Sequence, residues 1–97
     1  MLPKNRKPVL PGEILKYEFL EPLNMTQQQL ADSLGITRVR VNEIISGKRS
    51  ITPDTAFRLA KYFNTCPDFW LNLQLNVDMW DTLQQHSHEY DQIESIA

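Results

Sequence analysis

The segment of residues 38–45 carries side chains that can form hydrogen bonds to the edges of DNA bases. The guanidinium groups of Arg38 and Arg40 could each donate two parallel bonds to a guanine, and the Asn42 amide could bond an adenine. Val39 could pack on the methyl group of a thymine. This chemistry requires a helix that presents these side chains outward and a second element that supports it.

The same segment has an apolar side that predicts how it packs. On a helical wheel the apolar cluster consists of Val41, Ile44 and Ile45. It lies opposite a side centred on Val39 and Glu43. An ordinary solvated helix also shows a charged outer face, so the wheel by itself leaves both interpretations open. Glu43 would repel phosphate unless it accepts a bond from cytosine N4 or pairs with a neighbouring arginine.

Two short helices with a tight turn between them are predicted in this part of the chain. Thr26 and Gln29 fit a capping box, in which each side chain bonds a free amide at the start of a helix. Gly35 suits the left-handed position that ends such a helix, and Thr37 offers the next N-cap. Because Ala31 is small, the second helix can cross the first closely. This is the pattern of a helix-turn-helix, whose second helix enters the major groove of DNA.

Residues next to these helices could contact phosphates. Gln27 lies at the start of the first helix, where free amides also attract an anion. Lys48 and Arg49 follow Gly47, which ends the second helix, and they could neutralise phosphates of the DNA backbone.

The N-terminal part of the chain predicts an arm and one more helix. Residues 1–10 hold prolines and basic side chains, which favour an extended or mobile basic arm. A first helix is expected to begin near Pro11 and to stop before Pro22. Leu15 and Phe19 are one turn apart and would face the core.

The C-terminal half predicts a fourth helix and a longer apolar segment. The fourth helix follows a Thr52–Pro53 start, and its apolar stripe consists of Ala56, Leu59, Ala60 and Phe63. The fifth segment opens at Cys66 and carries two apolar stripes. The first stripe consists of Trp70, Leu73, Val77 and Trp80. The second stripe consists of Leu71, Leu75, Met79 and Leu83.

Two stripes on one helix favour packing of one face on the domain and of the other on a second chain. The predicted dimer interface consists of Leu71, Leu75, Met79, Trp80 and Leu83. A homodimer would place two recognition helices about 34 Å apart, in successive major grooves of a palindromic site. In the alternative, the segment breaks near Asn76 into two short helices. Residues 86–97 predict a frayed polar tail, which leaves residues 11–85 as the helical domain.

Length and composition limit the class of protein. The chain has 97 residues, 41% of them hydrophobic, which suits one small folded domain. No apolar run approaches the about 18 residues of a membrane span, and the N-terminus lacks an apolar signal segment, so no membrane partner is expected. The single cysteine, Cys66, cannot form an internal disulfide, which favours a cytoplasmic location.

Charge is distributed unevenly along the chain, whose net charge is −2. Residues 1–50 carry eight Lys or Arg and five Asp or Glu, whereas residues 51–97 carry two and seven. The basic half could meet a polyanion and the acidic half a basic partner, or the charges could simply cover a solvated surface.

An enzymatic or metal-binding role is not indicated. The chain has no phosphate-binding loop, nucleophile elbow or zinc motif. His86 and His88 are two residues apart, so on a helix they point in different directions and cannot share a metal as residues four apart could. We therefore expect no catalytic residue, no cofactor and no metal.

Longer stretches of the sequence resemble a known family. The stretch TQQQLADSLGITRVRVNEIISGKRSITPDTAFRLAKYF resembles the Cro/C1-type helix-turn-helix family. PGEILKYEFLEPL before it, VNEIISGKRSIT within it and DTAFRLAKYFNTCPDFWLNLQ at its end are similar to HigA antitoxins, also described as the virulence-associated protein I type. The resemblance covers roughly residues 11–80. It implies an all-α, lambda-repressor-like DNA-binding domain of five to six helices.

The resemblance also implies a function. Such a chain would be a dimeric antitoxin that neutralises a HigB, RelE-like mRNA endonuclease by direct contact and represses its own operon. The expected partners are palindromic double-stranded operator DNA, the cognate toxin and a second copy of the chain. A stand-alone dimeric repressor without a toxin is the alternative, and a hydrolase that uses the histidine tail is a third hypothesis.

Several residues match positions that face DNA in the wider repressor family. They are Gln27, Thr37, Arg38, Val39 and Arg40, and Lys48 matches a phosphate-facing position. With the residues chosen from their chemistry, the predicted DNA-contacting set is Gln27, Thr37, Arg38, Val39, Arg40, Asn42, Glu43, Lys48 and Arg49.

Overall fold

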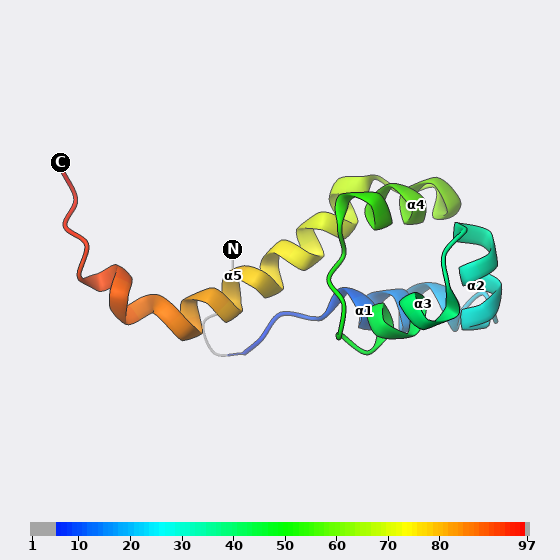
Figure 1. The fold of residues 1–97 in the computed structure, drawn as a ribbon, viewed down its shortest axis with the longest axis horizontal. Helices are drawn as coiled ribbons and strands as arrows, with labels where there is room; N and C mark the ends of the chain where they lie inside the picture. The colour runs from blue at the N-terminus through cyan, green and yellow to red at the C-terminus, as the bar shows by residue number, and fades with distance from the viewer. Residues whose placement is uncertain (1–5, 97) are drawn as a thin grey trace.

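The computed structural model describes residues 6–96, which form a helical domain with one long helix projecting from it (Figure 1). The elements are α1 (Pro11–Ile14), η1 (Leu15–Leu20), α2 (Gln27–Leu34), α3 (Arg38–Ile45), α4 (Pro53–Phe63) and α5 (Pro67–Asp91). The predicted all-α fold is confirmed. Of the predicted basic arm, residues 1–5 lie outside the described part of the chain.

The first helical rod joins α1 to η1, a π-helical continuation. Pro11 occupies the first turn of α1, where its missing amide proton is not needed. At the end of η1 the amide of the capping residue Glu21 donates to the carbonyl oxygen of Lys16, five residues back, at 3.0 Å. Leu15 is buried and Phe19 packs against the core, as the sequence predicts.

The two helices of the predicted motif are α2 and α3. The amide of Gln29 donates to Thr26 Oγ1 at 3.1 Å, and the amide of Thr26 donates to Gln29 Oε1 at 2.9 Å, so the capping box is present. Gly35 ends α2 with a φ of 71°. Thr37 Oγ1 accepts from the amide of Arg40 at 3.1 Å and caps α3. The predicted helix-turn-helix is therefore confirmed in its geometry.

The end of α3 rests on the start of α1. Val41 and Ile44 on the underside of α3 are buried. Gly12 of α1 lies so close to this helix that a Cβ there would overlap the carbonyl oxygen of Ile44 and lie 2.8 Å from the carbonyl carbon of Ile45. The sequence reading did not identify this contact, which a residue larger than glycine would disturb.

The hydrophobic core joins buried residues of η1, α2, α3, α4 and the start of α5. The buried residues of α4 are Thr55, Ala56, Leu59 and Ala60. The Phe19 ring centroid lies 4.7 Å from that of Phe63 and 5.0 Å from that of Trp70. Trp70 is fully buried, and its indole N–H donates to Thr65 Oγ1 at 2.9 Å. These aromatic rings join α5 to the domain.

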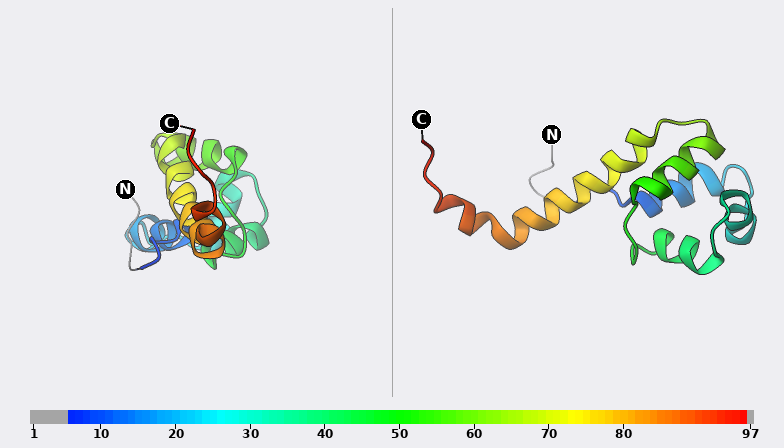
Figure 2. Two further views of the ribbon diagram at one scale, coloured as in Figure 1. Left: turned by 90° about the vertical axis from the view of Figure 1, so that its left-hand side faces the viewer. Right: turned by 45° about the horizontal axis from the view of Figure 1, so that its top comes forward.

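Helix α5 leaves the domain as one continuous helix, which bends toward its C-terminal end (Figures 1 and 2). The alternative of a break near Asn76 is therefore wrong. The helix also continues past His86 to Asp91, so the first part of the predicted frayed tail is helical. In the described part of the arm, Lys7 Nζ lies 3.1 Å from the Asp81 carboxylate on α5.

Candidate nucleic-acid interface

The outer face of α3 is exposed over a buried underside. Val39 is 68% exposed, and Arg38 and Asn42 are also exposed. Beneath them, Val41 and Ile44 are 1% and 3% exposed. The helix therefore has the orientation that the wheel predicts, with its aliphatic side inward.

Asn42 and Gln27 join the two helices of the motif on this face. Asn42 Nδ2 donates to Gln27 Oε1 at 3.2 Å. The bond uses one donor of Asn42 and one acceptor lone pair of Gln27, so each amide keeps further groups for a ligand. Two residues predicted on different helices are thus held side by side.

Glu43 pairs with Arg49, which lies just after α3. Nε and Nη2 of Arg49 donate to Glu43 Oε1 at 3.1 and 2.8 Å. This is one of the two conditions under which we expected Glu43 to be tolerated near phosphate. The pair offsets the charge of Arg49, so a phosphate would have to compete with Glu43 for that guanidinium.

Arg38 and Lys48 keep their charge unpaired within the described residues. Both side chains are exposed, one at the start of α3 and the other after its end. Thr37 uses an acceptor lone pair for the cap of α3, and its hydroxyl proton can still be donated. The uncompensated positive charge of this face therefore lies at Arg38 and Lys48.

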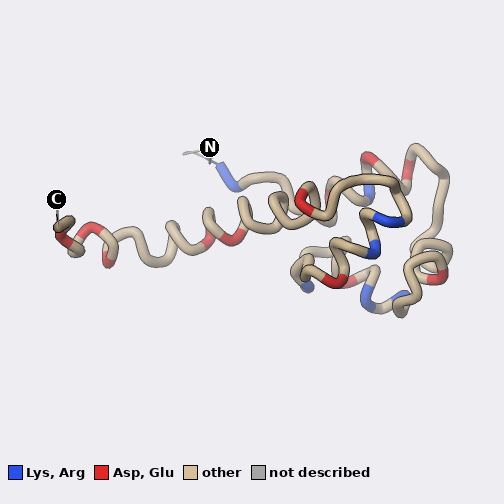
Figure 3. The backbone as a smooth tube through the Cα atoms, turned by 90° about the horizontal axis from the view of Figure 1, so that it is seen from above, with Lys and Arg blue, Asp and Glu red and all other residues tan. Residues whose placement is uncertain are grey.

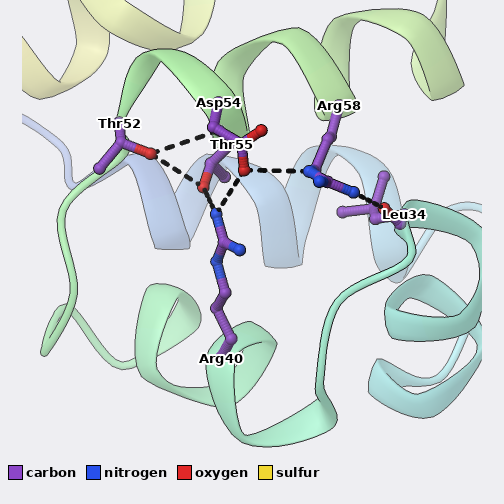
Figure 4. A network of polar contacts seen from close by, with 6 residues as sticks. All are labelled: Leu34, Arg40, Thr52, Asp54, Thr55 and Arg58. Atoms are coloured by element: carbon purple, nitrogen blue, oxygen red, sulfur yellow. Dashed lines mark hydrogen bonds and ion pairs between the residues drawn. The ribbon is translucent and has the colours of Figure 1, made fainter.

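The Arg40 side chain does not point outward as predicted. Its Nη2 donates to Thr55 Oγ1 at 2.6 Å and to Asp54 Oδ2 at 3.0 Å, both in the first turn of α4 (Figure 4). Its Nε is buried and finds no acceptor among the described residues. A helical wheel missed this because it places only the Cβ direction, while a long arginine side chain can turn toward acceptors on another helix.

Arg58 extends the same network to the turn before α3. Its Nε donates to Asp54 Oδ2 at 3.0 Å, and its Nη1 donates to the carbonyl oxygen of Leu34 at 2.8 Å (Figure 4). The end of a helix leaves such carbonyls without a partner inside the helix. Asp54 therefore joins two guanidinium groups, one on α3 and one bound to the end of α2.

This arrangement sets the charge of the Asp54 carboxyl. The hydrogen bond from Arg40 and then that from Arg58 lower its pKa below the ordinary 3.8, with their charges acting in the same direction. The sequence reading did not identify Asp54, Thr55 or Arg58 as part of this face. The available signal was the acidic residue that directly follows Thr52 and Pro53, two residues that by themselves predict only the beginning of a helix.

The basic residues and the exposed apolar groove lie in different parts of the molecule. Lys and Arg lie in the arm and the helical domain, whereas α5 carries Asp and Glu without Lys or Arg (Figure 3). Of the predicted dimer interface, Leu71 and Trp80 are half-buried. Leu75, Met79 and Leu83 are exposed and, with Tyr90, line an open groove on the projecting helix.

Residues 6–96 hold neither a cluster of metal ligands nor a membrane-spanning helix. In this range no three His, Cys, Asp or Glu side chains gather where a metal ion could be held. None of the described helices combines the length and the apolar character needed to cross a bilayer. His86 Nδ1 lies 2.8 Å from a Glu89 carboxylate oxygen on the exposed surface of α5.

The sequence is similar to those of known helix-turn-helix proteins. A family model described as helix-turn-helix matches residues 16–71. The antitoxin HigA-1 of Vibrio cholerae is 43% identical over 84 residues, which are 87% of this chain and 79% of that protein. YbaQ, an uncharacterised helix-turn-helix-type transcriptional regulator of Escherichia coli K12, is 46% identical over 94 residues, 95% of this chain and 83% of that protein.

The structure is also similar to a solved antitoxin. The antitoxin HigA of Pseudomonas aeruginosa, solved with the higBA promoter, superposes with a TM-score of 0.89 at 34% identity. The superposition covers 94% of this chain and 100% of that chain. The long α5 is therefore part of the shared architecture as well as the helix-turn-helix.

Proposed function

Because this chain belongs to the Cro/C1-type helix-turn-helix family and is a homologue of the HigA antitoxins, we propose that it represses its own promoter and neutralises a toxin encoded beside it. This is a family of DNA-binding regulators and not of enzymes. The observation that carries the proposal is the outer face of α3, where Arg38, Val39 and Asn42 are exposed over a buried apolar underside.

In the proposed complex, α3 lies in the major groove of DNA. Arg38, Val39 and Asn42 face the base edges, since they are exposed on the first turns of the helix. Lys48, Thr37 and Gln27 hold phosphates, which set the register of the protein on the duplex. Glu43 and Arg49 act as a pair at the rim of this surface.

We propose that α5 forms the dimer. The helix projects from the domain, and the exposed Leu75, Met79 and Leu83 have no cover within the described chain. A second copy that packs on this face would bury the groove and pair two recognition helices. An interface of this kind is the same patch on both copies, so it matches a palindromic operator.

The toxin proposal is supported by family and by charge. A protein that cleaves RNA must bind a polyanion and is expected to be basic. After Lys61 this chain carries acidic residues and no Lys or Arg. Charge complementarity of this kind speeds association and selects partners. We propose the acidic C-terminal half as a docking region for the toxin.

The DNA proposal is tested with the purified protein and a duplex from its own promoter. Fluorescence anisotropy at low ionic strength should show tighter binding to this duplex than to a scrambled duplex of equal length and composition. Equal binding to both, or no binding, would overturn the proposal.

The toxin proposal is tested by co-expression with the neighbouring gene. A small basic protein that co-purifies with this chain, and whose growth inhibition this chain relieves, supports the antitoxin function. If the chain binds its promoter but neither binds nor relieves the neighbouring product, it is a stand-alone repressor. The two experiments therefore separate the two functions.

A further inference from the structure

We infer that Arg40 positions the recognition helix instead of reading DNA. The inference rests on the proposed DNA-binding function, and it gives Arg40 a role different from the one expected from the sequence. Arg40 bridges α3 to the first turn of α4 through Asp54 and Thr55. These two bonds fix the angle at which α3 presents its exposed side chains.

The bridge acts where apolar packing does not reach. The underside of α3 packs against α1 and α2, and the Arg40 side chain spans from α3 across to α4 (Figure 4). Thr55, its acceptor, is 1% exposed and therefore belongs to the rigid core. A bond to a core residue holds α3 more firmly than a bond to a mobile surface side chain would.

Asp54 links the Arg40 bridge to a second arginine, Arg58. The same Oδ2 accepts from Arg40 on α3 and from Arg58, whose Nη1 bonds the Leu34 carbonyl at the end of α2. Arg58 Nη1 also lies 3.3 Å from where a Cβ of Gly35 would be, so it packs on the turn itself. One carboxylate thereby ties both helices of the motif to α4.

The surroundings of Arg40 do not suit a residue that contacts DNA. To reach a base or phosphate, its Nη2 would have to leave Thr55 and Asp54. Its Nε is already buried without an acceptor, which costs free energy that the bonds to α4 must offset. Arg38 and Lys48, in contrast, are exposed and unpaired within the described chain.

The direction in which one substitution changes DNA affinity distinguishes the two roles of Arg40. Asp54→Ala removes a negative charge from a DNA-binding protein, and on electrostatic grounds this strengthens binding or leaves it unchanged. If Arg40 contacts DNA, freeing it from Asp54 also strengthens binding. If Arg40 positions α3, loss of Asp54 weakens binding to the operator, because the bridge and the contact with Arg58 are both lost.

The chain supplies a matched control for this variant. Asp68 follows Pro67 at the start of α5 as Asp54 follows Pro53 at the start of α4, and it has no ion pair within the described chain. Asp68→Ala therefore removes the same charge from the first turn of a helix without changing the bonds of Asp54 to Arg40 and Arg58.

The experiment measures the ratio of affinities for the promoter duplex and the scrambled duplex, well below the melting temperature. Arg40→Met and Asp54→Ala should each lower this ratio about tenfold, the size of one good base contact. The double variant should have a promoter-to-scrambled ratio no lower than that of whichever single variant has the lower ratio. Asp68→Ala should behave as wild type, and Arg40→Met should leave the slope of log affinity against log salt unchanged.

Other outcomes would overturn the inference. They are an Asp54→Ala variant that binds the promoter at least as tightly as wild type, or an Arg40→Met variant that loses a salt slope of about 0.9, the value for one phosphate. A lowered melting temperature with an unchanged ratio would show a structural role only. If Arg40→Met does not fold, the Asp54→Ala variant, which changes an exposed residue, tests the inference by itself. A wild-type protein that does not distinguish the duplexes refutes the proposed function instead.

Discussion

The backbone of Gly12 lies in direct contact with the carbonyl group of Ile44, so α1 supports the last turn of the recognition helix without an intervening side chain. A methyl group at Gly12 would enter space held by backbone, which cannot move aside as a side chain can. Gly12→Ala should lower the free energy of unfolding by about 1–3 kcal/mol, the usual effect of overpacking. Urea denaturation measures this, and Glu13→Ala, on the exposed neighbour, should stay within about 0.5 kcal/mol of wild type.

Arg38 is the exposed guanidinium on the outer face of α3. If it reads a base edge, Arg38→Ala should cost about 1–3 kcal/mol of operator binding and relax the preference at one base position. Binding to a set of promoter duplexes, each with one base pair changed, locates that position. The same loss on every duplex would show that Arg38 contacts phosphate only.

Lys48 follows α3 as an unpaired cation within the described chain. A phosphate contact carries no sequence information, so Lys48→Ala should weaken binding to promoter and scrambled duplexes alike. The slope of log affinity against log salt should fall by about one. A change in the promoter-to-scrambled ratio would instead assign Lys48 to base recognition. Lys61→Ala, on α4, is the control that removes an equal charge elsewhere.

Met79 lies in the middle of the exposed apolar face of α5, between Leu75 and Leu83. Met79→Asp would place an uncompensated charge in the proposed dimer interface and should yield monomers in sedimentation velocity runs at several concentrations. Asn76→Asp adds the same charge on the same helix, outside this groove, and should leave the dimer intact. Dimers of unchanged stability in Met79→Asp would move the interface to another surface.

The lowered pKa of Asp54 predicts that the stability of the protein depends on pH. Its pKa in the folded protein is lowered, first by the hydrogen bond from Arg40 and then by that from Arg58. A lowered pKa means that the ionised carboxylate stabilises the folded state above its ordinary pKa of 3.8, and that this contribution is lost as the pH falls through the folded value. The stability difference between wild type and Asp54→Asn should therefore be constant near neutral pH and shrink below 3.8. Denaturation curves of both proteins across this range test it, and a difference that grows in acid would contradict the assignment.

The sequence alone determined where α2, α3 and α4 begin and which side of α3 faces inward. Caps such as Thr26, Thr37 and Thr52 act through bonds to amides three residues away, so they can be recognised without knowledge of the tertiary structure. The apolar period of α3 predicted that Val41 and Ile44 are buried, because burial of one stripe is required of any short helix on a small domain. The two stripes of α5 likewise predicted one packed and one exposed face.

Only the tertiary structure decided which polar side chains remain free. Arg40 and Arg38 have the same chemistry and lie on the same helix, but Arg40 meets Asp54 and Thr55, which are distant in sequence. The closeness of Gly12 to Ile44 depends on how two helices cross, and no local pattern encodes that distance. Bonds between residues far apart in the chain depend on the assembled fold, so the sequence supplied the candidate polar groups, and packing determined which of them remain exposed and unpaired.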